Sequence, residues 1–172
     1  TLTPNIEKAI GIDLNPLAVK IASVKTKLIP TKVLEDAYMD IMDYMLSAKY
    51  NVFDTDLPHF KNVDFWFKEQ VIKDLAKLKQ AINKIKRNDI KDFFLIIFSE
   101  VVRNVSNTRK GEFKLYRIPE SKLKNYNPSV EKEFEKIATK NIKGMGQFVK
   151  ALKNLGREKF PWNGIDIRFH DT

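Results

Sequence analysis

Lys8-Ala-Ile-Gly-Ile-Asp13 is a short apolar run that ends in an acid, and Leu14-Asn15-Pro16 follows it. A run of this length, closed by turn-forming residues, predicts a β-strand. Asn15 can cap a following helix, and Pro16 suits the first helical position, where its missing N–H is no loss. Apolar residues then recur at helical spacing as far as Leu28, before Pro30. The front of the chain therefore predicts a strand, a turn and a helix.

A second strand is expected at the other end of the chain, because Ile165-Asp-Ile-Arg-Phe169 alternates apolar and polar residues. Periodicity predicts helices between the strands: Val33 to about Ala48, Asp64 to about Arg87, Asp89 to about Arg103, and Asn127-Pro128 to Gly156. The predicted fold class is mainly α with a partial α/β element, a helical insertion between two strands of a parallel sheet. Two strands alone do not form a stable sheet, so further strands are expected from elsewhere.

Three of these helices carry extra signals. In the helix predicted from Asp64 to about Arg87, apolar residues repeat every three or four positions, at Val71, Leu75, Leu78, Ile82 and Ile85. The helix from Asp89 is apolar nearly all round, which is typical of the centre of a bundle. In the last helix, Gly144 and Gly146 favour a bend or break.

Composition narrows the class of protein. The chain has 172 residues, of which 43% are hydrophobic, so it can bury a core and is not a disordered tail. It has no cysteine, which excludes disulfides and thiolate chemistry and fits a reducing compartment such as the cytoplasm. The longest dense apolar run, Phe93 to Phe98, is far shorter than the roughly 20 residues of a membrane span, so no membrane segment is expected.

The positive charge is concentrated in one part of the chain. The formal net charge is +9, and residues 101–126 hold seven basic and two acidic side chains. This density favours a polyanionic partner, while a solvated lysine-rich surface is the alternative.

The acid at the end of the first strand is a candidate binding residue. In doubly wound folds such an acid can accept hydrogen bonds from both hydroxyls of a nucleoside ribose, because strand ends face the ligand crevice. Asp13 has this position. A plain Asx-type helix start is the alternative.

The sequence from Gly11 to Thr26 resembles S-adenosylmethionine-dependent DNA methyltransferases of the amino-methylating type. Those enzymes follow their second strand with a "Gly, hydrophobic, Asp/Glu, hydrophobic, Asn-Pro" turn and an Ala/Val-rich helix. Ser106 to Arg117 is similar to a stretch of the helical insertion in a subgroup of them.

The resemblance implies that the cofactor is S-adenosylmethionine. Asp13 would bind its ribose and Leu14 would lie against its adenine, and Asn15 and Pro16 would complete the turn that carries them. Asp171 would accept from the adenine amino group. It implies a cofactor-binding element at residues 1–30 and 160–172 and an insertion at 31–159. The first Gly-rich motif and the catalytic Pro-Pro-Tyr/Phe tetrapeptide are absent. The chain is therefore expected to be an internal part of such an enzyme, without catalytic residues and inactive by itself. Its expected partner is the missing remainder of the methyltransferase domain. The target base, cytosine or adenine, stays open.

DNA is the expected partner of the basic stretch. Arginine and lysine can neutralise phosphates, whereas asparagine, threonine and tyrosine can contact bases or backbone. The candidates are Arg103, Asn107, Thr108, Arg109, Lys110, Lys114, Tyr116 and Arg117. The alternative is a surface hairpin closed by Gly111.

Other residues carry weaker signals. Phe65-Trp66-Phe67 could stack on bases, but core or interface packing is the favoured interpretation. His59 and His170 are far apart in sequence and lack companion ligands, so no metal site is expected. Two other functions stay open: a helical nucleic-acid-binding module without catalysis, and an unrelated α/β enzyme fragment that binds another nucleoside, such as a dinucleotide.

Overall fold

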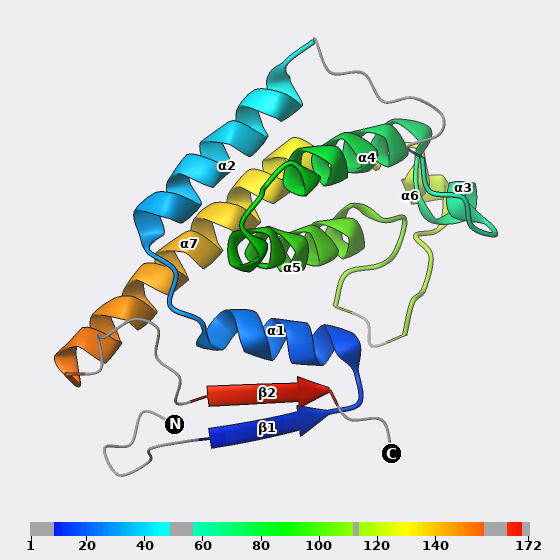
Figure 1. Ribbon diagram of the computed structural model, residues 1–172. Coiled ribbons are helices and arrows are strands. Elements are labelled where there is room, and N and C mark those ends of the chain that lie inside the picture. The colour runs from blue at the N-terminus through cyan, green and yellow to red at the C-terminus, as the bar shows by residue number, and fades with distance from the viewer. Residues whose placement is uncertain (1–8, 49–56, 112–113, 157–164, 170–172) are drawn as a thin grey trace.

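The computed structural model describes residues 9–48, 57–111, 114–156 and 165–169. In chain order its elements are β1 (Ala9–Asp13), α1 (Pro16–Thr26), α2 (Thr31–Leu46), α3 (Val63–Trp66), α4 (Glu69–Asn83), α5 (Asn88–Val105), α6 (Glu120–Leu123), α7 (Val130–Asn154) and β2 (Ile165–Phe169). Figure 1 shows the two strands at the bottom, α1 directly above them, α2, α4 and α5 above α1, and α7 running obliquely down the left side.

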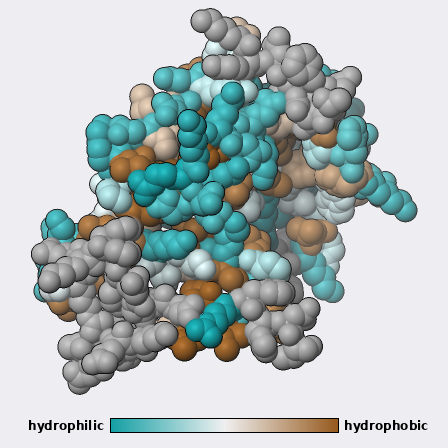
Figure 2. Space-filling view, in the orientation of Figure 1, coloured by the Kyte–Doolittle hydropathy of each residue, from teal (hydrophilic) through white to brown (hydrophobic). Residues whose placement is uncertain are grey.

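The two strands pair in parallel, so that Ala9 faces Ile165 and Asp13 faces Phe169. Both predicted strands are confirmed, and the helices lie between them in sequence as expected. Ile10 and Ile12 share one face of β1 and are 53% and 66% exposed. Figure 2 shows apolar side chains gathered over these strands, at the foot of the molecule. Two strands with such a face do not make a complete sheet.

The core lies among the long helices, with α5 at its centre. α5 packs against α1, α4 and α7, which confirms the prediction of a central helix. Phe94 and Val101 on α5 are 0% exposed, as is Phe134 on α7. The rings of Phe94 and Phe134 are 6.1 Å apart, within the range of favourable aromatic contact. This packing holds α5 against α7.

The predicted helix from Asp64 to Arg87 is wrong at both ends. The chain turns at Asn62, which has a φ of 64°, makes the single turn α3, and becomes extended at Phe67 before α4 begins. A continuous helix would need the carbonyl oxygens of Phe65 and Trp66 for its own next turn, but these oxygens accept hydrogen bonds from Asn107 and Arg117. The predicted apolar stripe of α4 is confirmed, because its members from Val71 to Ile82 are buried.

The last helix is continuous from Val130 to Asn154, so the expected bend or break at Gly144 and Gly146 does not occur. Gly146 instead allows a close approach of α2. A Cβ at this position would lie 3.1 Å from the Cγ2 atom of Thr31, closer than most carbon contacts. The glycine therefore serves the packing of α7 on α2.

Candidate functional site

The turn after β1 has the predicted geometry. The backbone N–H of Asn15 donates to Asp13 Oδ1 at 2.7 Å, and the side chain of Asn15 accepts from the N–H of Leu17 at 2.9 Å. Pro16 occupies the first turn of α1. The turn is therefore an Asx-type helix start, and it also places the acid Asp13 at the end of the strand. The two interpretations given above as alternatives describe the same turn.

The exposed groups of this turn can accept a ligand. Asp13 is exposed, and only its Oδ1 atom has a hydrogen bond among the described residues. Leu14 is 59% exposed, which leaves an apolar surface beside the carboxylate. β2 ends at the same edge as β1 because the strands are parallel, and the chain continues from there toward Asp171, which lies outside the described residues. A carboxylate beside an apolar side chain suits a nucleoside, because the carboxylate can accept hydrogen bonds from the ribose hydroxyls and the apolar side chain can pack against the base.

The basic stretch folds back on itself after α5. Thr108 and Arg117 form an antiparallel bridge, and the N–H of Arg109 donates to the carbonyl of Tyr116 at 2.8 Å. Gly111 has a φ of 80°, which favours glycine at this bend. The surface hairpin closed by Gly111, posed as the alternative to a DNA contact, is therefore present, and we call its described residues, 107–111 and 114–118, the basic hairpin. Its side chains at Arg109, Lys110, Lys114 and Tyr116 are exposed.

Two predicted DNA-contacting residues of the hairpin lie inside the fold. Asn107 is 2% exposed and Thr108 is 8% exposed. Asn107 donates through its side chain to the carbonyl of Phe65, and Thr108 shares a 2.7 Å hydrogen bond with Ser106. Contact between these side chains and DNA would require the hairpin to open, so the structure corrects the expectation. Their polar groups are used to fix the hairpin to the rest of the chain.

Arg117 also has structural partners. Its Nε atom donates to the carbonyl of Phe65 at 2.9 Å, its guanidinium lies 4.4 Å from the centre of the Phe65 ring, and it pairs with Glu120 at 2.6 Å. This guanidinium therefore joins α3, the hairpin and α6. Phe65 is 45% exposed and carries Arg117 on its ring.

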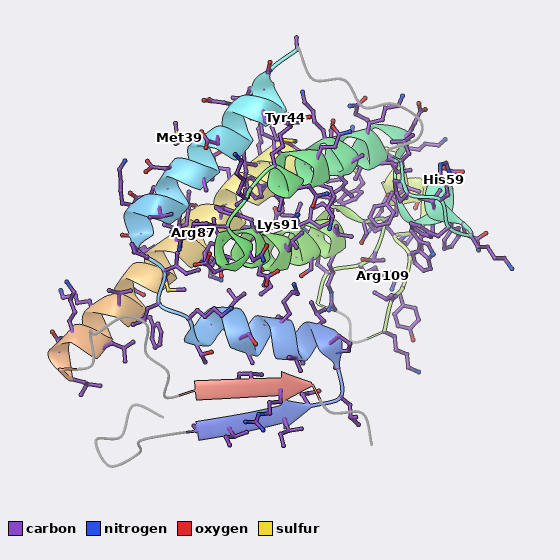
Figure 3. All side chains as sticks on the ribbon, viewed as in Figure 1. Met39, Tyr44, His59, Arg87, Lys91 and Arg109 are labelled. Carbon is purple, nitrogen blue, oxygen red and sulfur yellow. The ribbon has the colours of Figure 1, made fainter. Side chains whose placement is uncertain are left out.

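The remaining candidates lie at the outer edge of the helical part. Arg103 is an exposed residue in the last turn of α5. Figure 3 places Arg109 on the hairpin and His59 on the loop before α3. In Figure 1 the hairpin and the carboxyl ends of both strands lie toward the same side, the right of the view. This arrangement puts the turn after β1 and the exposed Arg109 on one side of the molecule.

A polar cavity of about 400 Å³ at the start of α7 was not predicted. Asn104 and Lys136 donate to Glu133 Oε1 at 2.9 and 3.2 Å. Burial pushes the pKa of Glu133 up, but these hydrogen bonds and the positive charges of Lys136 and Lys110 outweigh it, so its pKa is lowered. Lys132 also lines this cavity. The sequence signal that would have revealed it is the repetition of lysine along the polar side of α7.

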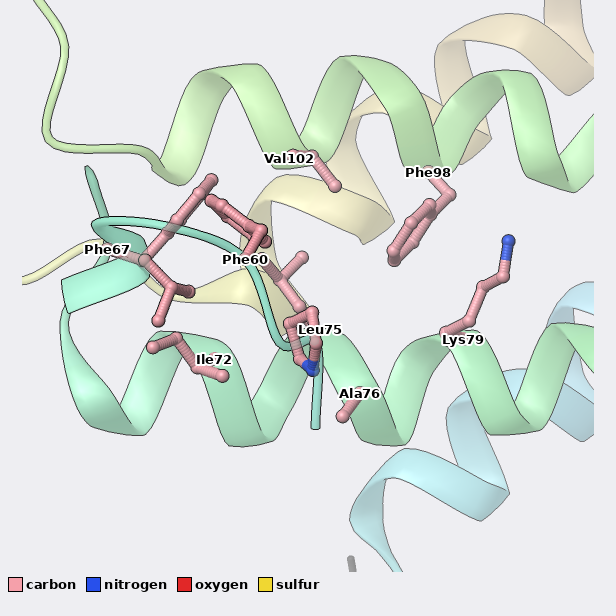
Figure 4. Close-up of a pocket in the computed structure, with 10 residues that line it drawn as sticks. Phe60, Phe67, Ile72, Leu75, Ala76, Lys79, Phe98 and Val102 are labelled. Atoms are coloured by element: carbon pink, nitrogen blue, oxygen red, sulfur yellow. The ribbon is translucent and has the colours of Figure 1, made fainter. Parts of the chain in front are cut away.

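An apolar pocket lies between α4, α5 and the loop before α3 (Figure 4). Its volume is about 340 Å³, and Phe60, Phe67 and Phe98 contribute most of its aromatic surface. Lys79 is the one charged side chain in its lining, with its Nζ atom 5.1 Å from the centre of the Phe98 ring. The lining contains no carboxylate, hydroxyl or imidazole, so this pocket has no evident catalytic chemistry.

The described part of the chain contains no group of three His, Cys, Asp or Glu residues placed to hold a metal ion. None of its helices is both long and apolar enough to cross a membrane.

Comparison with known proteins supports the resemblance seen in the sequence. The chain is 41% identical over 154 residues, 85% of its length, to the type II methyltransferase M.MvaI of Kocuria varians, a DNA methyltransferase. It spans 33% of that relative. No family model matches the chain, and no solved structure matches it. The predicted similarity to DNA methyltransferases is confirmed.

Proposed function

We propose that the chain forms part of a DNA methyltransferase that transfers a methyl group from S-adenosylmethionine to an exocyclic amino group of cytosine or adenine in DNA. The observation that carries this proposal is the 41% identity to a type II methyltransferase over 85% of the chain. Because the chain corresponds to 33% of that relative, the complete reaction is assigned to a larger protein that contains these residues.

The turn after β1 is assigned to the cofactor. The exposed carboxylate of Asp13 is placed to accept from the ribose hydroxyls, and the exposed Leu14 offers a surface to the adenine ring. Asn15 and Pro16 support this turn by starting α1. Asp171 is assigned to the adenine amino group. When bound, S-adenosylmethionine supplies the methyl group on its sulfonium, and the role of these residues is to orient the nucleoside half.

The basic hairpin is assigned to DNA. Arg109, Lys110 and Lys114 are exposed and can neutralise phosphates, and Tyr116 is exposed beside them. Arg103 is retained as a further phosphate contact from the end of α5. Asn107, Thr108 and Arg117 are assigned a supporting role. The side chains of Asn107 and Arg117 donate to the Phe65 carbonyl on α3, and the Thr108 hydroxyl is hydrogen-bonded to Ser106.

This proposal divides the chain into a partial Rossmann-like element at residues 1–30 and 160–172 and a helical insertion at 31–159. The catalytic tetrapeptide is absent from these residues. The group that accepts from the target amino group is therefore assigned to another part of the protein, and the chain by itself is expected to be inactive.

The test is binding of S-adenosylmethionine to the longest natural polypeptide that contains this chain, measured by titration calorimetry. Asp13→Ala removes two hydrogen bonds from a charged acceptor, so we expect affinity to fall by about tenfold to a hundredfold. Asp40→Ala removes an equally exposed carboxylate from α2 and serves as the matched control.

Unchanged affinity of the Asp13→Ala variant would reject the cofactor assignment. If the wild-type protein binds DNA but no S-adenosylmethionine, a helical nucleic-acid-binding module becomes the better description. If it binds a dinucleotide in place of S-adenosylmethionine, the chain belongs to a different class of α/β enzyme.

A further inference from the structure

The outward side of α7 carries a row of lysines. The row consists of Lys132, Lys136, Lys140, Lys143 and Lys150, all of them exposed. At 100° per residue these positions fall within an arc of about 80°, and the row is about 27 Å long. The buried residues of the same helix, such as Phe134 and Ile137, lie on the opposite side. We name this feature the α7 lysine row.

The row is a concentrated positive charge. Among the described residues, only Lys136 has a carboxylate partner, Glu133 at 3.2 Å. The three acidic residues of α7 lie in its first two turns, and the helix from Thr139 to Asn154 contains none. A solvated helix face usually mixes both signs of charge, so a run of one sign requires another explanation.

The row is continuous with the basic hairpin. Lys110 of the hairpin lines the same polar cavity as Lys132 and Lys136, and its charge acts on Glu133 in that cavity. A ligand that contacts the exposed hairpin residues can therefore continue onto α7 across the cavity, where Lys110, Lys132 and Lys136 outnumber the single carboxylate of Glu133.

We propose that the α7 lysine row binds the sugar-phosphate backbone of duplex DNA beyond the segment held by the basic hairpin. The choice of DNA rests on the proposed function. About 27 Å of duplex carries roughly 16 phosphates, which is a linear array of charge that matches a linear row of ammonium groups. Lysine contributes a point charge rather than base readout, so this contact adds affinity without sequence preference.

The surroundings of the row disfavour other anionic partners. The exposed side chains between the lysines are small or polar, as at Thr139 and Gln147. The nearest aromatic and aliphatic side chains, Phe148 and Met145, are at least half-buried and line a pocket beside Lys140. A helix that lies in a membrane surface inserts its apolar face, but that face of α7 is buried against α5 and α2. Nucleic acid is the partner that requires charge alone.

The test measures binding of an arbitrary duplex to the 172-residue chain by fluorescence anisotropy between about 50 and 200 mM salt. The variant is Lys140→Gln with Lys143→Gln, since glutamine keeps helix propensity. We expect affinity to fall about tenfold to a hundredfold near 0.1 M salt, equally for all sequences, and the slope of log affinity against log salt to drop by about 1.8. The control, Lys61→Gln with Lys86→Gln, removes the same charge from exposed loop positions and leaves both values as in wild type.

Each other outcome has a distinct meaning. If the α7 variant binds DNA like wild type while Arg109→Ala weakens binding, the lysine row is not a DNA contact and the proposed function stands. If neither change matters, the DNA assignment of the hairpin fails as well. An equal loss in the control pair rejects the inference in favour of a net-charge effect. Loss of binding to phosphatidylserine vesicles with unchanged DNA affinity rejects it in favour of a membrane surface.

Discussion

The helices α2 and α7 pack against each other but present opposite charges to solvent. Each buries an apolar stripe, including Leu34 and Ile41 on α2 and Phe134 on α7. The exposed charges of α2 are mainly carboxylates, at Glu35, Asp36, Asp40 and Asp43, whereas those of α7 are mainly lysines. A solvated helix face is compatible with folding at either sign of charge. If α7 contacts DNA as proposed, this difference favours the approach of a polyanion to α7 over α2.

The largest effect is expected from a substitution in the core that α2 and α7 share. Phe134 is 0% exposed, with its ring 6.1 Å from those of Tyr38 on α2 and Phe94 on α5. Phe134→Ala should lower the free energy of unfolding by about 3–5 kcal/mol, measured by urea denaturation. Phe134→Leu keeps most of the apolar volume and should cost about 1–1.5 kcal/mol. Equal, small losses for both variants would contradict the packing of α2 and α7 through this ring.

A smaller effect is expected for a charge on α7, and its dependence on pH should distinguish it from a charge on α2. The side chain of Glu133 is 16% exposed and accepts two hydrogen bonds, so Glu133→Gln should cost about 1 kcal/mol near neutral pH. The folded pKa of Glu133 lies below its unfolded value. The wild-type advantage is therefore fully present above the unfolded pKa, about 4.3, and is lost as pH falls through the folded pKa.

Asp36→Asn on α2 is the matched comparison, because Asp36 pairs with Lys32 in an exposed i,i+4 pair. Such pairs contribute little, so this variant should unfold like wild type at every pH. Thermal unfolding of all three proteins between about pH 3 and 7 makes the comparison. A Glu133→Gln cost that stays constant with pH would contradict the role given to its charge.

The elements predicted correctly are those whose signals are local. The cap at Asn15 with Pro16, the apolar stripe of α4 and the alternation of Ile165 to Phe169 lie within a few residues of the structure they specify. The break between α3 and α4 could not be predicted, because its cause is competition for two carbonyl groups by Asn107 and Arg117, far along the chain.

The candidate site divides in the same way. The geometry at Asp13 follows from neighbouring residues, so the sequence predicted it. Asn107 and Thr108 are polar and were expected at the surface, but the contacts that bury them come from α3 and from the folded hairpin itself. The α7 lysine row was visible as spacing in the sequence, although only the packing of α7 shows that the row faces outward.

The most direct measurement is the identity of the methylated base. The longest natural polypeptide that contains this chain is incubated with DNA and S-adenosylmethionine carrying a labelled methyl group, and the digested nucleosides are separated by mass spectrometry. We predict label in N4-methylcytosine or N6-methyladenine, at the wild-type rate in Asp40→Ala and at a reduced rate in Asp13→Ala when S-adenosylmethionine is limiting. Label at carbon 5 of cytosine, or transfer that is unaffected by Asp13→Ala, would contradict the proposed function.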